Sequence, residues 1–218
     1  MRKYRHLIHF LLIMSLFWSI ISLPSCTYNH YKGFKKVTSN NRNLPLTFDT
    51  SFQKATYITD FVIVGNQLSG ITIIKNVKRT NTFHVVFMSQ IGLKYFDMTI
   101  AMDKDTDWLN INYMMKSLDR EFVIEALKLN FKLLFTKTVC KKLEFYQDPE
   151  SRVQEIIARD NEETASYLFK NDQIHSMYLR KSKSVLASIQ IPEYDSDYPN
   201  KIMIENKKAR LKMVMTAF

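Results

Sequence analysis

The chain has 218 residues, which suits one domain with ample material for a hydrophobic core. Its formal net charge of +10 at pH 7 favours anionic partners, either lipid headgroups or nucleic acid, although most such charges simply keep a surface solvated. Only four glycines are present, which argues against Gly-rich loops that bring the backbone close to a cofactor.

The N-terminus has the pattern of an export signal. Arg2, Lys3 and Arg5 precede an almost wholly apolar run, residues 7–23, which ends at Leu23-Pro24-Ser25-Cys26. This ending resembles the lipobox of bacterial lipoproteins. The resemblance implies a signal peptide at residues 1–25, cleavage before Cys26 and a lipid on the Cys26 sulfur. The alternative is an uncleaved membrane anchor, because the apolar run approaches the roughly 20 residues that span a bilayer.

The residues after Cys26 bear on location and compartment. In Gram-negative lipoproteins an Asp after the lipidated Cys favours the inner membrane, whereas this chain has Thr27. We therefore expect a lipid-anchored protein on the periplasmic face of the outer membrane, where nucleic acid is not a partner. Residues 26–50, rich in Asn, Ser, Lys and Tyr, are expected to be the lipidated Cys and a flexible tether. Cys140 is then left without a disulfide partner and is expected to be a small buried hydrophobe.

From residue 51 onward the pattern predicts a mainly β domain, residues 51–218, with some α-helix. Alternating and β-branched segments predict strands joined by short turns, about eleven in all. The first five form an antiparallel meander: 53–64, 67–77, 82–89, 93–102 and 109–115. After an interruption at residues 118–136, the strands resume at 139–146, 153–159, 164–169, 173–180, 184–191, 201–206 and 209–215, with a polar loop at 192–199.

Residues 118–136 interrupt the strands with helical spacing. Val123, Leu127, Phe131 and Leu134 recur on one side, and further apolar residues widen the stripe. Because most of the circumference is apolar, this long helix must be covered on more than one side.

Catalytic and metal-binding motifs are not found. After residue 26 the histidines are His30, His84 and His175, and none has metal-ligand spacing with another ligand. The series Asp103, Asp105 and Asp107 faintly suggests a calcium loop, but it lacks the Gly and distal Glu of an EF-hand, so a solvated turn is expected. We predict a non-enzymatic protein without metal or cofactor. A hydrolase would need a polar cleft containing His84 or His175.

Two segments give the domain a resemblance to the lipoprotein carrier and receptor family of the Gram-negative envelope (LolA/LolB-like). One runs from Leu68 to Lys75 (Leu-Ser-Gly-Ile-Thr-Ile-Ile-Lys) and is followed by strands 82–89 and 93–102. The other runs from Tyr198 to Ile204 (Tyr-Pro-Asn-Lys-Ile-Met-Ile) and is followed by residues 209–215. The resemblance implies a curved antiparallel sheet, an incomplete β-barrel, whose apolar concave face is covered by helix.

The resemblance suggests that the half-barrel holds an apolar ligand, either acyl chains or the lipid of a lipoprotein. Strand parity and the helix stripe give the predicted wall of that site, which consists of Phe96, Met98, Ile100, Leu109, Ile111, Tyr113, Phe131 and Leu134. The alternative is a half-barrel with a filled core that serves as an accessory subunit of an envelope assembly. A monomer is expected in either case.

Overall fold

The fold is a computed structural model. It describes residues 34–38, 46–48, 51–102, 108–135, 142–149, 153–160, 163–182, 184–195 and 198–218. The chain divides into two units, Met1–Lys32 and Gly33–Phe218, and every described residue belongs to the second. Cys26, the residues 103–107 and Cys140 lie outside the described residues.

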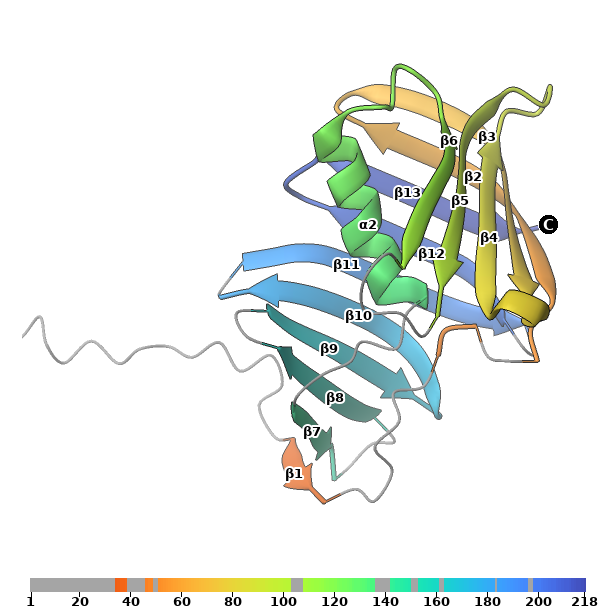
Figure 1. The fold of residues 1–218 in the computed structure, drawn as a ribbon. Helices are drawn as coiled ribbons and strands as arrows, with labels where there is room; N and C mark the ends of the chain where they lie inside the picture. The colour runs from red at the N-terminus through yellow and green to blue at the C-terminus, as the bar shows by residue number, and fades with distance from the viewer. Residues whose placement is uncertain are drawn as a thin grey trace, which may run out of the picture. The chain divides into compact units, whose positions relative to one another are not determined.

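The second unit is built on one 13-stranded antiparallel sheet (Figure 1). Its strands are β1 (Lys35–Val37), β2 (Lys54–Ile63), β3 (Asn66–Val77), β4 (Thr82–Met88), β5 (Lys94–Ala101), β6 (Leu109–Met114), β7 (Lys142–Gln147), β8 (Val153–Asp160), β9 (Glu163–Lys170), β10 (Gln173–Lys181), β11 (Ser184–Asp195), β12 (Tyr198–Asn206) and β13 (Leu211–Ala217). Their order in the sheet is β1-β7-β8-β9-β10-β11-β12-β13-β2-β3-β4-β5-β6, so β1 and β6 are its two edges. The predicted mainly β, curved and unclosed sheet is confirmed.

The strands form because the sequence alternates. In β2, Tyr57, Thr59, Phe61 and Ile63 are buried while the residues between them are more exposed. Val64 and Gly65 both have positive φ, at 47° and 80°, and they join β2 to β3 in a two-residue turn. Turns with two positive φ values match the right-handed twist of paired strands, so this hairpin continues the curvature of the sheet.

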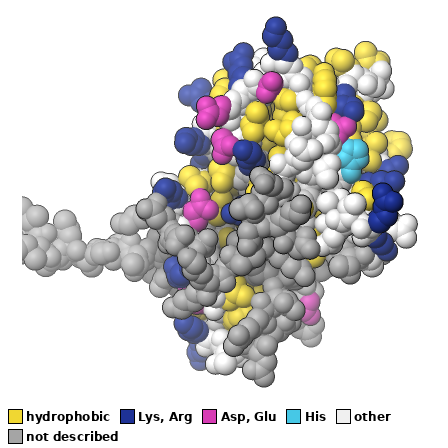
Figure 2. Space-filling view, viewed as in Figure 1, with side chains coloured by type: hydrophobic (Ala, Val, Ile, Leu, Met, Phe, Trp, Pro, Cys, Tyr) yellow, Lys and Arg dark blue, Asp and Glu magenta, His cyan; other side chains and the backbone are white. Residues whose placement is uncertain are grey.

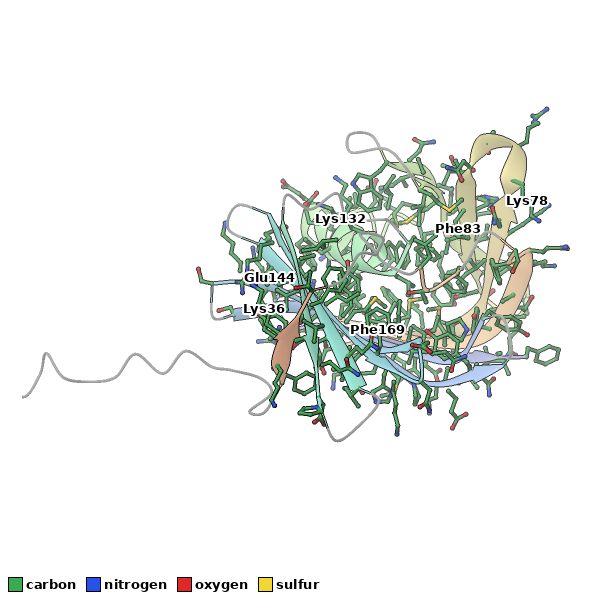
Figure 3. All side chains as sticks on the ribbon, turned by 90° about the horizontal axis from the view of Figure 1, so that it is seen from below. Lys36, Lys78, Phe83, Lys132, Glu144 and Phe169 are labelled. Carbon is green, nitrogen blue, oxygen red and sulfur yellow. The ribbon has the colours of Figure 1, made fainter. Side chains whose placement is uncertain are left out.

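The folded unit begins earlier than the sequence predicted. Residues 35–37 form β1, which pairs with β7, and Lys36 Nζ lies 3.1 Å from a carboxylate oxygen of Glu144 (Figure 3). Thr47 and Phe48 are buried in the core. The predicted boundary at residue 51 is therefore wrong for these residues. A three-residue strand and one inserted Phe have no periodicity that sequence analysis could detect.

The predicted loop at 192–199 is also mostly strand. β11 continues to Asp195 and β12 begins at Tyr198, with register shifts in their pairing between Gln190 and Tyr194. These irregularities accommodate Pro192, which cannot donate a ladder hydrogen bond and is tolerated in a sheet mainly at bulges and edges. Proline was therefore a poor guide to a loop here.

One α-helix, α2 (Glu121–Phe135), is present among the described residues and interrupts the strand series as predicted. It packs against β10, β11 and β12 and lies over the inner face of the curved sheet (Figure 1). The hydrophobic core is the layer between this helix and the sheet, and in Figure 3 side chains fill that space, Phe83 among them. The helix therefore decides which part of the inner face is reachable.

Candidate functional site

α2 places one apolar side against the sheet. Glu121 in its first turn and Lys132 in its last favour this helix direction through the helix dipole. The side chains that it buries against the sheet are Val123, Ala126, Leu127, Asn130, Phe131, Leu133, Leu134 and Phe135. All but one are apolar, so burial of this side holds the helix in place.

Most of the predicted wall does come together. Phe96, Met98 and Ile100 of β5 are fully buried, and Phe131 and Leu134 of α2 are buried as well. The rings of Phe96 and Phe131 have centroids 6.1 Å apart in a T-shaped arrangement, which joins sheet and helix directly. Leu109 and Ile111 of β6 are partly buried against the same core.

Tyr113 does not join this wall. The pairing of β5 with β6 matches Met98 with Ile111 but Asp97 with Tyr113, so Asn112 is an extra residue, a β-bulge. The bulge reverses the alternation of side chains, so Tyr113 lies on the opposite face of the sheet and is 43% exposed. The centroid of its ring is 5.9 Å from Lys94 Nζ. The predicted inward position of Tyr113 is therefore wrong, because strand parity was continued through an unrecognised bulge.

Aromatic rings form a connected series between α2 and strands β2, β4 and β5. Phe48 lies 4.8 Å from Phe52 and 5.4 Å from Phe135, measured between ring centroids, and Phe135 lies 5.1 Å from Phe83. The series continues through Phe131, Phe96, Phe87, Phe61 and Tyr95. Because these rings contact one another at ordinary packing distances, they pack directly against the predicted wall residues and leave no open surface there.

A groove lies beside α2 and is lined by both apolar and polar side chains. Its volume is about 450 Å³. It is lined by Glu121, Phe122, Glu125, Ala126, Leu129, Asn206, Lys208 and Ala209. The turn between β12 and β13 is held in place by Asn206, whose Oδ1 accepts a 3.1 Å hydrogen bond from the backbone N–H of Ala209. The groove thus lies between the exposed side of the helix and a fixed hairpin turn.

The chemistry of the groove is amphipathic. Phe122, 43% exposed, with Ala126, Leu129 and Ala209, offers apolar contact, whereas Glu121, Glu125 and Lys208 are polar. Acidic and basic side chains lie beside apolar ones on the exposed surface around α2 (Figure 2). A smaller hollow of about 110 Å³ lies on another side of Phe122, against Val64 and Leu68. Such a surface can hold an apolar chain with a polar end.

Sequence analysis did not identify the groove as a site. The clue was present, because the apolar stripe of the helix is too wide to be covered by one layer, and Phe122 and Leu129 belong to the uncovered part. The other half of the groove comes from residues 206–209, which the sequence shows only as a strand end and a turn. Their position beside α2 depends on the strand order of the finished sheet.

A polar cluster occupies the opposite face of β4–β6. The Asp97 carboxylate accepts hydrogen bonds from Lys94 Nζ at 2.6 Å and Asn112 Nδ2 at 2.8 Å, and it lies 2.7 Å from His84 Nε2. Burial alone would raise the pKa of Asp97, but the bonds from Lys94, Asn112 and His84 outweigh it and lower that pKa to about 2. His84 is therefore part of a structural ion cluster on the face away from α2.

No group of three His, Cys, Asp or Glu side chains that could hold a metal ion occurs among the described residues. His175 is exposed in β10, away from the Asp97 cluster in the strand order. Within the same residues, no helix is long and apolar enough to cross a membrane.

Comparison with known proteins gives distant neighbours only. No protein-family model matches the sequence, and no curated protein matches it. Among solved structures, the chain is similar to a DUF1329 family protein from Desulfovibrio piger, with 9% sequence identity and a TM-score of 0.46. It is also similar to a domain from Vibrio parahaemolyticus that is named for outer-membrane lipoprotein sorting, with 8% identity and a TM-score of 0.35. Each match covers 78% of this chain and 85% of the other.

Proposed function

We propose that this protein is a non-enzymatic lipoprotein, anchored through Cys26 to the periplasmic face of the outer membrane, that binds acyl chains of a lipid or lipoprotein. The observation that carries the ligand proposal is the groove of about 450 Å³ between α2 and the β12–β13 turn. Its lining combines apolar side chains with charged ones, a composition that suits an amphiphile with an apolar chain and a polar head.

The route to the concave face follows from the helix. The predicted wall residues of β5 and α2 are buried under aromatic contacts, so a chain that reaches them must displace α2 or its neighbouring rings. The groove needs no such movement, because Phe122 and Leu129 already line open space. We therefore assign the groove as the first binding position and the concave face as a deeper one that opens only when α2 moves.

The charge of the chain supports a membrane setting. The full chain has a net charge of +10, and cleavage before Cys26 would remove three basic residues and leave about +7. Each Lys or Arg near an anionic bilayer contributes about 1 kcal/mol of attraction. A lipid anchor at Cys26 would hold the domain where acyl chains are available. Two or more chains anchor a protein stably, whereas one gives only reversible binding.

Photocrosslinking in membranes tests the proposal on the full chain. The probe is a palmitic acid analogue that carries a diazirine and an alkyne. We expect saturable labelling, mapped to peptides of α2 or of residues 206–209. The variant Leu129→Lys places a charge in the groove and should lower that labelling at least fivefold. The matched control Ile58→Lys changes an exposed residue of β2 and should leave labelling within twofold. Labelling that is unsaturable, or equal in Leu129→Lys and the wild type, would contradict the proposal.

The second candidate is an accessory subunit whose half-barrel core is filled. The specific observation in its favour is the aromatic series from Phe48 to Tyr95, which packs between α2 and strands β2, β4 and β5. A filled core that binds nothing predicts no saturable labelling and an unchanged melting temperature when palmitate is added. The ligand-binding proposal predicts saturable labelling and a rise in melting temperature, because a ligand that binds only the native state stabilises it.

A further inference from the structure

Asn130 is the polar exception on the buried side of α2. Its exposed fraction is 0%, and neither its Nδ2 nor its Oδ1 has a hydrogen-bond partner. Among the described residues, Asn76 and Arg180 also have a buried side-chain atom without a partner. Each of those side chains has another atom that is bonded, Asn76 Nδ2 to the Phe52 carbonyl and Arg180 Nη1 to Ser166 Oγ. Asn130 has neither atom bonded.

The strands opposite α2 offer few polar side chains, Asn206 of β12 being the buried exception on their inward side. α2 packs on β10, β11 and β12, whose buried inward residues are nearly all apolar. They include Met177 and Leu179 of β10, Ala187 and Ile189 of β11, and Ile202 and Ile204 of β12. Burying an amide without hydrogen bonds costs about 1–3 kcal/mol in proteins, and Asn is also a poor helix former. An apolar residue would stabilise the closed domain better at this position.

The position of Asn130 relates it to the groove. It follows Leu129 directly and lies one helical turn beyond Ala126, and both of these residues line the groove. Because residues four apart lie on the same face of a helix, Asn130 adjoins the buried side of that groove. A chain that enters beside Ala126 and moves under α2 would meet this amide before any other unpartnered polar group described on the helix.

We propose that Asn130 recognises a neutral carbonyl linkage, an ester or an amide, in a ligand held against α2. The Nδ2 group donates to the carbonyl oxygen, and Oδ1 accepts from the N–H of an amide linkage. The inference rests on the proposed function and goes beyond it, because it distinguishes carbonyl-bearing acyl ligands from plain hydrocarbon chains. Asn130 acts here as a specificity residue. The unpaired amide becomes paired when the ligand is bound.

The test compares three diazirine probes with the same alkyl chain: a methyl ester, an N-methyl amide and a hydrocarbon without a polar group. Each probe labels the full chain in membranes. The variant Asn130→Leu keeps a similar volume and removes the amide. It should lower labelling by the ester and amide probes about tenfold, the loss expected for one buried hydrogen bond. Labelling by the hydrocarbon probe should stay within twofold. Asn130→Ala should show the same selectivity.

A matched control and a melting experiment complete the design. Leu133→Met conserves volume at a buried position of α2 that belongs neither to the groove nor to the predicted wall, and it should leave labelling by all three probes within twofold. Without ligand, Asn130→Leu should melt at a higher temperature than the wild type, because an unpaired buried amide is removed. Equal loss of all three probes, no loss of the carbonyl probes or a lower melting temperature would overturn the assignment of Asn130. A wild-type chain that binds none of the probes would instead overturn the proposed function.

Discussion

Phe48 stacks on Phe135, with ring centroids 5.4 Å apart and ring planes inclined by 14°. The contact joins a residue that precedes the first long strand to the last residue of α2. Phe48 also lies 5.9 Å from Phe83 and is 1% exposed, so it closes one end of the aromatic series. The segment before β2 is therefore part of the structure that fixes the helix.

We predict that Phe48→Ala lowers the free energy of unfolding by about 3–5 kcal/mol, the usual cost of removing a buried Phe ring. Chemical denaturation of the full chain in detergent measures this loss. Phe218→Ala is the control, because Phe218 is 92% exposed, and its effect should stay within about 0.5 kcal/mol. Equal stabilities of the two variants would contradict the assigned role of Phe48.

Gly70 is required by the close approach of β3 to β4. A Cβ at this position would overlap the backbone oxygen of Met88, which cannot move without disturbing the strand pairing. We predict that Gly70→Ala destabilises the domain by about 3 kcal/mol, near the upper end for overpacking. The neighbouring Ser69→Ala removes only an exposed hydrogen bond to Asp60 and should cost less than about 1 kcal/mol. Melting temperatures of the two variants give the comparison, and an unperturbed Gly70→Ala would show that the strands can separate there.

The Asp97 cluster predicts acid sensitivity. The hydrogen bonds from Lys94, Asn112 and His84 lower the pKa of Asp97 to about 2, below its ordinary value of 3.8, despite the opposing effect of burial. The stabilisation is therefore complete above about pH 4 and is lost as the pH falls through about 2. Asp97→Asn should lose about 2 kcal/mol of stability at pH 7 and little more on acidification. Denaturation curves at pH 7 and pH 2 test this, and a parallel acid response of variant and wild type would refute it.

The lipid anchor is tested at Cys26. The thiol of this residue would carry the lipid, and cleavage before residue 26 would follow lipidation. We predict that Cys26→Ala incorporates no radiolabelled palmitate and keeps its signal peptide. Cys140→Ala is the control and should be labelled like the wild type. Palmitate on the Cys26→Ala protein would remove the anchor and, with it, the reason for an outer-membrane location.

Most of the sheet could be predicted from sequence because its strands alternate and its turns are short. In β2 and β5, apolar side chains that face the core recur at every second residue, Phe61 in β2 and Phe96 in β5 among them. This pattern locates each strand and its inner face. The limits of α2 were predicted to within three residues at its start and one at its end, because its apolar stripe is long.

The parts that could not be predicted depend on single residues or on tertiary position. β1 is three residues long, and its pairing with β7 is a contact more than a hundred residues distant in sequence. The bulge at Asn112 changes the side of Tyr113 without any glycine or proline to mark it. Whether the Asn130 amide finds a hydrogen-bond partner depends on which side chains lie opposite the helix, and sequence periodicity alone cannot supply that information.

The same bulge has a consequence for how copies of the chain behave when they crowd on a surface. β6 is an edge of the sheet, and an unbroken edge strand invites strands from neighbouring molecules to add to it. Asn112 disturbs the even spacing of the backbone groups along β6, and the other edge, β1, offers only three residues. Neither edge is a good template for a foreign strand. Dense packing of this protein on a membrane should therefore not lead to strand-by-strand aggregation.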